Sequence, residues 1–263
     1  IRIDSEGSSL VPMVLHRASA YPVHEVRFQL VQGLLAGIGL CLLAYSLVNW
    51  VLSRDRVFLY YAICQAGVTG FFFSFHGLGS QHLWPESPWM MRHAPLLGAQ
   101  IGLIGSALFA DQALRVREIH PRASFALRAL AAFFATTLVG QGTDVIPYGA
   151  VHMLVNLVGV VPMAIAVPVA IQRTREGEPG ASFMLLGWSA YAIGVVSIAL
   201  LLRGHLPVNP WTLHVFQASS VLETLMWMAV LGRRNALIRD TAAHAERERR
   251  RLSSLAQADP LTG

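Results

Sequence analysis

Seven stretches of this 263-residue chain are long and apolar enough to cross a lipid bilayer. A membrane-spanning helix needs about 20 mostly apolar residues, because the hydrocarbon core is about 30 Å thick. Only 13% of the residues are charged, against about 25% in a soluble domain. We therefore predict an all-α membrane protein whose fold is a seven-transmembrane helix bundle. The predicted spans are 28–52, 57–75, 94–114, 124–139, 148–171, 181–202 and 211–231.

Arginine is concentrated in alternate connections between these spans. The chain has no lysine, so all 20 residues counted as lysine or arginine are arginine. Positively charged residues accumulate in the cytoplasmic connections of membrane proteins, which predicts an outside N-terminus and a cytoplasmic C-terminus. The arginines on the predicted cytoplasmic side are Arg54, Arg56, Arg115, Arg117, Arg122, Arg173, Arg175, Arg233, Arg234 and Arg239.

The chain divides into four predicted segments. Residues 1–26 contain two short β-leaning runs, which we interpret as the remnant of a β-domain outside the membrane. Residues 27–232 form the seven-transmembrane sensor, and residues 233–258 form a cytoplasmic signalling helix. Residues 259–263 begin a further domain, because Pro260 disfavours a helical conformation at Asp259. The chain starts without a methionine, and we interpret it as part of a longer protein.

The predicted signalling helix carries a four-three spacing typical of a coiled coil. A polar asparagine at a core position favours one register and often a dimer, so we expect a homodimer through this helix. Three of the eight core residues are alanine, which buries little surface, and one is arginine, so the interface is marginal. The alternative is a single solvated helix. The predicted core positions are Leu231, Asn235, Ile238, Ala242, Ala245, Arg249, Leu252 and Ala256.

The last residues, QADPLTG after an arginine-rich helix, resemble the opening of a GGDEF domain, the catalytic domain of diguanylate cyclases. The resemblance rests on Asp259, Leu261, Thr262 and Gly263. It implies that a cyclase using Mg²⁺ and GTP to make cyclic di-GMP follows in the parent protein. No catalytic residue and no cofactor is assigned to this chain.

The membrane part resembles the bacterial seven-transmembrane receptors with diverse intracellular signalling modules. The similarity is carried by YYAICQAGVTGFFFSFHGLGSQHLWPESPW and by FQASSVLETLMWMAVLGRRNALIR, within residues 28–240. It implies a bacterial inner-membrane receptor with a periplasmic, carbohydrate-binding-like β-domain before the helices. The expected partners are the lipid bilayer and an unidentified periplasmic small-molecule or carbohydrate-like ligand.

Glu223 lies near the middle of the seventh span. A carboxylate at that depth costs at least about 2.5 kcal/mol unless it is protonated or paired. Gln217, Asn156 and Tyr191 are its candidate partners. One interpretation makes Glu223 a polar pivot that couples the seventh span to its neighbours, and the other gives it one hydrogen bond for helix packing.

Histidines gather on the predicted outer side, where a proton or metal sensor is conceivable because histidine titrates near neutral pH and ligates metals. Their spacing matches no metal motif, so no metal site is assigned, and the alternative is a set of interfacial polar residues. The outer candidates are His76, His82, His93, His152, His205 and His214.

Small and helix-breaking residues predict two further features of the bundle. The pairs Gly33/Gly37 and Gly98/Gly102 allow close helix approach, within the bundle rather than between receptors. Proline inside a helix removes a hydrogen bond and bends it, which predicts a kink in the fifth span. The prolines of that span are Pro162 and Pro168.

Other functions are less consistent with the sequence. A small-solute transporter or channel with an incidental tail remains the main alternative, although the spans contain few charged residues. A retinal protein is excluded because no lysine is present to form a Schiff base. No nucleophile motif or acidic pair indicates an enzyme within the membrane. The basic residues lie at span ends, so nucleic acid is not an expected partner.

Overall fold

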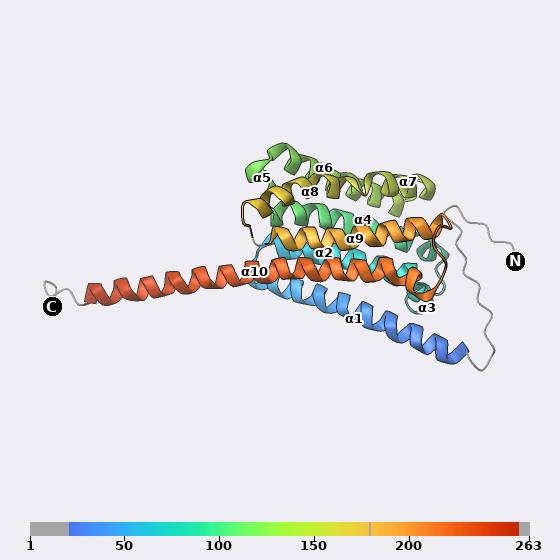
Figure 1. The fold of residues 1–263 in the computed structure, drawn as a ribbon, viewed down its shortest axis with the longest axis horizontal. Helices are drawn as coiled ribbons and strands as arrows, with labels where there is room; N and C mark the ends of the chain where they lie inside the picture. Colours follow the sequence, from blue (N-terminus) through green and yellow to red (C-terminus); the bar gives the residue numbers. More distant parts are fainter. Residues whose placement is uncertain (1–20, 179, 258–263) are drawn as a thin grey trace.

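The computed structural model describes residues 21–178 and 180–257 as an antiparallel helix bundle from which one long helix projects (Figure 1). Seven helices in this part of the chain are long and apolar enough to span a membrane, and they match the seven predicted stretches. All regular elements among the described residues are helices. The all-α, seven-helix prediction is therefore confirmed.

Ten helices account for the described residues, because one span is broken in two and two turns contain short helices. The helices are α1 (Tyr21–Ser53), α2 (Arg56–Phe75), α3 (Leu78–His82), α4 (Pro88–Ala113), α5 (Val116–Ile119), α6 (Pro121–Gly142), α7 (Tyr148–Val158), α8 (Val161–Arg175), α9 (Ala181–Leu202) and α10 (Pro210–Gln257).

Local sequence signals explain where several helices begin. Asp55 caps α2 by accepting a hydrogen bond from the Val57 backbone N–H at 3.1 Å. Ser87 caps α4, which has proline at its first position. Asn209 accepts hydrogen bonds from two backbone N–H groups at the start of α10. Asp, Ser and Asn side chains satisfy N–H groups that have no partner within the helix.

The fifth span is broken at Gly159 and Val160, between α7 and α8. Pro162 lies in the first turn of α8, where its missing N–H is tolerated. The same proline cannot continue α7, because it lacks the donor that an unbroken helix would need. Pro168 lies inside α8 without ending it. The span is therefore interrupted beside Pro162, at the place where the sequence predicts a kink.

Helices α2 and α4 pack more extensively than any other pair, and glycine makes that approach possible. A Cβ atom on Gly67 or Gly105 would overlap the backbone of the opposing helix, and one on Gly98 would lie 2.5 Å from the Phe71 nitrogen. The Gly98/Gly102 pair thus serves packing within the bundle, as the sequence predicts. By contrast, a Cβ on Gly33 or Gly37 would meet no other atom within 4 Å.

An aromatic part of the core lies between α2, α4, α9 and α10. The Phe109 and Trp227 rings stack with centroids 4.9 Å apart, and Trp188 meets Trp227 edge to face at 5.9 Å. Tyr61 packs against Phe109 at 5.6 Å. Offset and edge-to-face arrangements are the favoured geometries of aromatic pairs. This cluster anchors α10 to the rest of the bundle.

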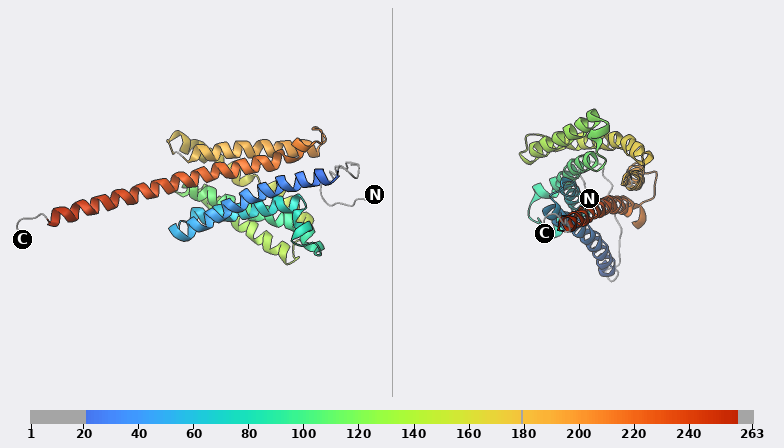
Figure 2. Two further views of the ribbon diagram at one scale, coloured as in Figure 1. Left: turned by 90° about the horizontal axis from the view of Figure 1, so that it is seen from below. Right: turned by 90° about the vertical axis from the view of Figure 1, so that its left-hand side faces the viewer.

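The two ends of the bundle differ in composition. We call the end that contains the α1–α2, α4–α6 and α8–α9 connections the arginine-rich end, and the opposite one the histidine-rich end. Contacts between distant segments confirm the first grouping: Arg173 on α8 donates to the backbone oxygens of Leu114 and Arg115, and Arg234 on α10 pairs with Asp55. Helix α10 leaves the bundle at the arginine-rich end (Figures 1 and 2).

Both chain ends differ in part from the predicted segments. Residues 21–26, predicted to belong to the β-remnant, form the start of α1. Helix α1 therefore begins at Tyr21, ahead of the predicted span. Residues 1–20 and 258–263 lie outside the described residues, including Asp259, Leu261, Thr262 and Gly263. Span seven and the signalling helix form one uninterrupted helix, α10, of 48 residues.

Replacing Gly105 with alanine should destabilise the bundle, because the added methyl group overlaps the α2 backbone at Cys64. Overpacking of this kind costs about 1–3 kcal/mol. The control is Gly37→Ala, which meets open space and gains helix propensity. We expect thermal unfolding in detergent to show a lower Tm for Gly105→Ala only. Equal Tm values for both variants would contradict the close α2–α4 approach.

Candidate functional site

Buried polar side chains line the face of α10 that meets α1 and α2. We call this group the polar seam; most of its members are fully buried, although the helices around them face an apolar environment. Polar groups in a low-dielectric interior require hydrogen-bond partners. The polar seam comprises Gln32 and Ser46 on α1, Tyr61, Gln65 and Thr69 on α2, and Gln217, Ser220, Glu223 and Thr224 on α10.

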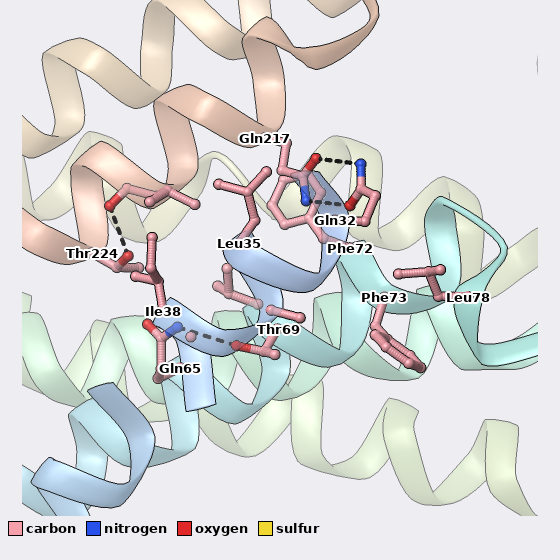
Figure 3. A pocket seen from close by; sticks show the side chains of 14 residues that line it. Gln32, Leu35, Ile38, Gln65, Thr69, Phe72, Phe73, Leu78, Gln217 and Thr224 are labelled. Carbon is pink, nitrogen blue, oxygen red and sulfur yellow. Dashed lines mark hydrogen bonds between the residues drawn. The ribbon is translucent and has the colours of Figure 1, made fainter. Parts of the chain in front are cut away.

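A reciprocal amide pair joins α1 to α10 toward the histidine-rich end. The Gln32 amide nitrogen donates to the Gln217 oxygen at 3.0 Å, and the Gln217 nitrogen donates to the Gln32 oxygen at 2.9 Å (Figure 3). Both residues are at most 3% exposed. Helix α1 lies at the edge of the bundle and diverges from it toward its N-terminal end (Figure 1). The pair therefore fixes α1 to α10 where few other contacts do.

The middle of the polar seam joins α10 to α2. The Tyr61 hydroxyl donates to the backbone oxygen of Thr224 at 2.8 Å, and Gln65 donates to Thr69 at 3.1 Å. Beside them lies a cavity of about 30 Å³ between α1, α2 and α10 (Figure 3), large enough for a water molecule. The buried Gln65 Oε1 atom lines it and has no hydrogen-bond partner among the described residues.

Glu223 is 8% exposed and accepts no hydrogen bond from a described residue. Of its three predicted partners, Tyr191 lies close enough to interact with the carboxylate electrostatically, as do Tyr61 and Cys64 of α2. Gln217 is paired with Gln32 instead.

Asn156 is placed differently from the prediction. It is exposed on α7 and contacts His152 one turn away. Helix α7 makes its main contacts with α4 and α6, and α10 is not among its main neighbours. The predicted pairing of Asn156 with Glu223 is therefore wrong.

Three consecutive residues of α10 fasten the helix to three other elements where it leaves the bundle. The Arg233 guanidinium lies 4.8 Å from the Phe183 ring centre on α9. Arg234 pairs with the Asp55 carboxylate at 2.6 Å, and Asn235 donates to the Asn49 side chain of α1 at 2.8 Å. We call Arg233, Arg234 and Asn235, with Phe183, Asp55 and Asn49, the exit clamp.

The bundle core and the exit clamp each use one position that the sequence assigned to a coiled-coil core. Leu231 is completely buried within the bundle, and Asn235 is bonded to Asn49 of the same chain. Of the remaining positions, Ile238, Ala245, Arg249 and Leu252 are exposed. The side chains of Ala242 and Ala256 lie outside the described residues.

The predicted outer histidines fall into two clusters and two isolated residues. The rings of His76 and His214 stack with centroids 5.6 Å apart. His93 stacks on Trp89 at 4.4 Å, and Tyr148 lies between His93 and His152. His82 and His205 are exposed. No group of three metal-ligating side chains occurs among the described residues.

The polar seam and the exit clamp together connect α10 to its neighbours along the length of the bundle. Hydrogen bonds tie α10 to α1 and α2 at three levels between the two ends of the bundle.

The sequence model of the family described as 7TM diverse intracellular signalling matches residues 28–234. The chain belongs to this family. The match covers the complete helix bundle and ends at Arg234, within the exit clamp. Neither the curated proteins nor the solved structures compared with this chain include a match.

Membership of the 7TM signalling family agrees with a polar seam suited to passing on a change of helix position. The sequence reasoning found Gln217 and Glu223 but missed Gln32, Gln65 and the pairing of Asp55 with Arg234. Gln32 and Gln65 could have been found as glutamines inside apolar spans, because each requires a buried partner. The ion pair joins residues 179 positions apart, and nothing in the local sequence indicates it.

Replacing either member of the amide pair with leucine should destabilise the bundle, because the other amide is left buried and unpaired. An unsatisfied buried group costs about 1–3 kcal/mol. The double variant Gln32→Leu/Gln217→Leu removes both amides and should recover most of the loss. Denaturant or thermal unfolding of the four proteins measures this coupling. Additive losses in the double variant would show that the two amides do not interact.

Proposed function

We propose that the protein is a bacterial inner-membrane receptor that relays a periplasmic signal through α10 to a cytoplasmic GGDEF diguanylate cyclase. The observation that carries this proposal is the continuity of α10, which runs from the polar seam through the exit clamp into the projecting tail. A helix without a break transmits rotation or translation along its axis. The family assignment supports a signalling role for the bundle.

The proposed orientation places the arginine-rich end and the tail in the cytoplasm. Its support is the positive-inside rule, applied to connections that meet at one end of the bundle. With seven crossings, the chain then begins in the periplasm. The histidine-rich end faces the periplasm in this arrangement, and a small-molecule or carbohydrate-like ligand would bias the helices from that side.

The proposed output depends on two tails acting together. Two cyclase domains must face each other to join two GTP molecules, and Mg²⁺ and GTP would bind in those domains. Because Leu231 and Asn235 are used within the bundle, the proposed coiled-coil contact begins at Ile238, which is 41% exposed. Leu252 is 61% exposed and continues the same spacing. A short, alanine-rich interface of this kind is weak enough to change register.

A transporter or channel remains the second candidate, and the ion pairs of the bundle argue against it. Asp111 is bound to Arg128 at 2.7 Å, and Asp55 to Arg234. Both carboxylates are therefore engaged at the arginine-rich end rather than lining a path through the membrane. Flux of small solutes through liposomes that contain the protein tests this alternative.

Removing the ion pair of the exit clamp should change cyclic di-GMP production by the full-length protein. Asp55→Asn removes the charge but keeps a side chain that caps α2 well, and Arg234→Gln removes the other partner. A partly exposed ion pair contributes up to about 1 kcal/mol. A loss of that size shifts a two-state balance by at most about fivefold at 25 °C. Mass spectrometry of cell extracts measures the product.

The double variant Asp55→Asn/Arg234→Gln should produce as much cyclic di-GMP as either single variant, because both changes remove the same interaction. Arg239→Gln is the matched control, since Arg239 is exposed on the tail beyond the exit clamp; it should leave production unchanged. Production that does not depend on Asp55 or Arg234 would rule out the clamp as part of the relay. A full-length protein without cyclic di-GMP synthesis under any condition would end the cyclase proposal.

A further inference from the structure

A pair of histidines connects α2 and α10 at the histidine-rich end. His76 follows the last residue of α2, and His214 lies in the first turns of α10. Their rings are nearly parallel, at 22°, with centroids 5.6 Å apart. Phe28 of α1 contacts both rings, at 6.5 Å from His76 and 6.2 Å from His214. Three helices that carry the polar seam therefore meet at this pair.

The hydrogen bonds around the pair leave it able to accept protons. Nδ1 of His76 lies 3.0 Å from the Phe72 backbone oxygen. Because a carbonyl can only accept, this contact places a proton on Nδ1 and leaves Nε2 as the acceptor in the neutral ring. Nδ1 of His214 is buried and has no hydrogen-bond partner among the described residues. Each ring therefore has one nitrogen that receives no hydrogen bond from a described residue.

The surroundings of the pair are mainly aromatic, with the Gln217 side chain beside His214, and no described carboxylate forms an ion pair with either ring. Phe72 and Phe75 contact His76 at 6.0 and 5.4 Å, and Glu25 accepts from Gln29 instead. The titratable side chains on the neighbouring elements include Arg27 of α1, His82 of α3, Arg92 and His93 of α4, and Tyr191, Arg203 and His205 of α9 and its end.

We propose that His76 and His214 form a proton-binding site, and that its occupancy sets how closely α10 packs against α2 and α1. In the neutral state the two imidazoles stack like other aromatic rings. When one ring is protonated, cation–π contact with the neighbouring aromatic faces stabilises its positive charge. A second proton places two like charges in a half-buried setting, where their repulsion favours separation of the helices.

The direction of the pH effect follows from the burial of His76. Burial, together with the neighbouring His214, lowers the pKa of His76, although the hydrogen bond to Phe72 opposes this. The native ring therefore binds a proton less readily than the unfolded chain, whose histidine pKa is about 6.5. The contribution of neutral His76 to stability is complete above that pH and is lost as the pH falls below it.

The site is close to the amide pair that links α1 and α10. Phe28 lies one turn before Gln32 on α1, and His214 lies one turn before Gln217 on α10. A movement that separates Phe28, His76 and His214 therefore strains the hydrogen bonds between Gln32 and Gln217. Proton binding and helix separation can be measured without the cytoplasmic module, so this proposal does not depend on the proposed cyclase output.

The test is the distance between the outer parts of α10 and of α3, which follows α2, measured by pulsed electron paramagnetic resonance in nanodiscs. Spin labels are placed at Leu83 and Trp211, both exposed, after Cys41→Ala; Cys64 is buried and remains. Between pH 7.5 and pH 5.0 we expect the distance to lengthen by about 1–2 Å, the size of helix shifts in switching proteins. An unchanged distance in the otherwise native protein overturns the proposal.

Variants identify which groups bind the proton. His214→Phe keeps an aromatic ring for stacking but cannot be protonated, so its distance should stay constant across the pH range. His205→Phe changes an exposed histidine at the same end and should behave like the parent protein. Lengthening in His214→Phe equal to that of the parent would also overturn the proposal. If His214→Phe does not fold, His76→Phe replaces it with the same expectation.

Discussion

Pairing of buried polar groups along one face of α10 is the constraint on which the arrangement of the bundle depends. Gln217 and Thr224 are buried within the seventh span, where backbone and side-chain polar groups require partners inside the protein. Gln32 and Tyr61 supply hydrogen bonds from α1 and α2, so the position of α10 is set by two neighbours as well as by its packing on α9. A helix positioned by a few specific bonds has a small number of alternative positions, which is the property that a two-state relay requires.

The fold was largely predictable because the bilayer imposes it. Runs of about 20 apolar residues can only be helices in a membrane. The arginines in alternate connections predict which connections lie together at one end of the bundle. Helix α9 has the bounds that its apolar run predicts, 181–202. The break between α7 and α8 followed from Pro162, and the close α2–α4 packing from Gly98 and Gly102.

Partners across the bundle were less predictable, because residue type indicates that a polar group needs a partner but not which one. The spacing predicts that Asn235 is a coiled-coil core residue, yet its side chain donates a hydrogen bond to Asn49 of α1. Asn156 is a candidate partner of Glu223 from the sequence, yet it is exposed on α7 and contacts His152. The predicted dimer and the cyclase stay predictions, since the tail residues that would carry them are exposed or lie outside the described part of the chain.

The most direct test of α10 as one rigid connection is a series of alanine insertions between Ile238 and Arg239, just beyond the exit clamp. Each added residue rotates the tail by about 100°, and seven residues return it to within about 20° of its original direction. The account predicts that cyclic di-GMP production by the full-length protein changes after one or two insertions and recovers after seven. A smooth change that follows only the number of inserted residues would contradict it.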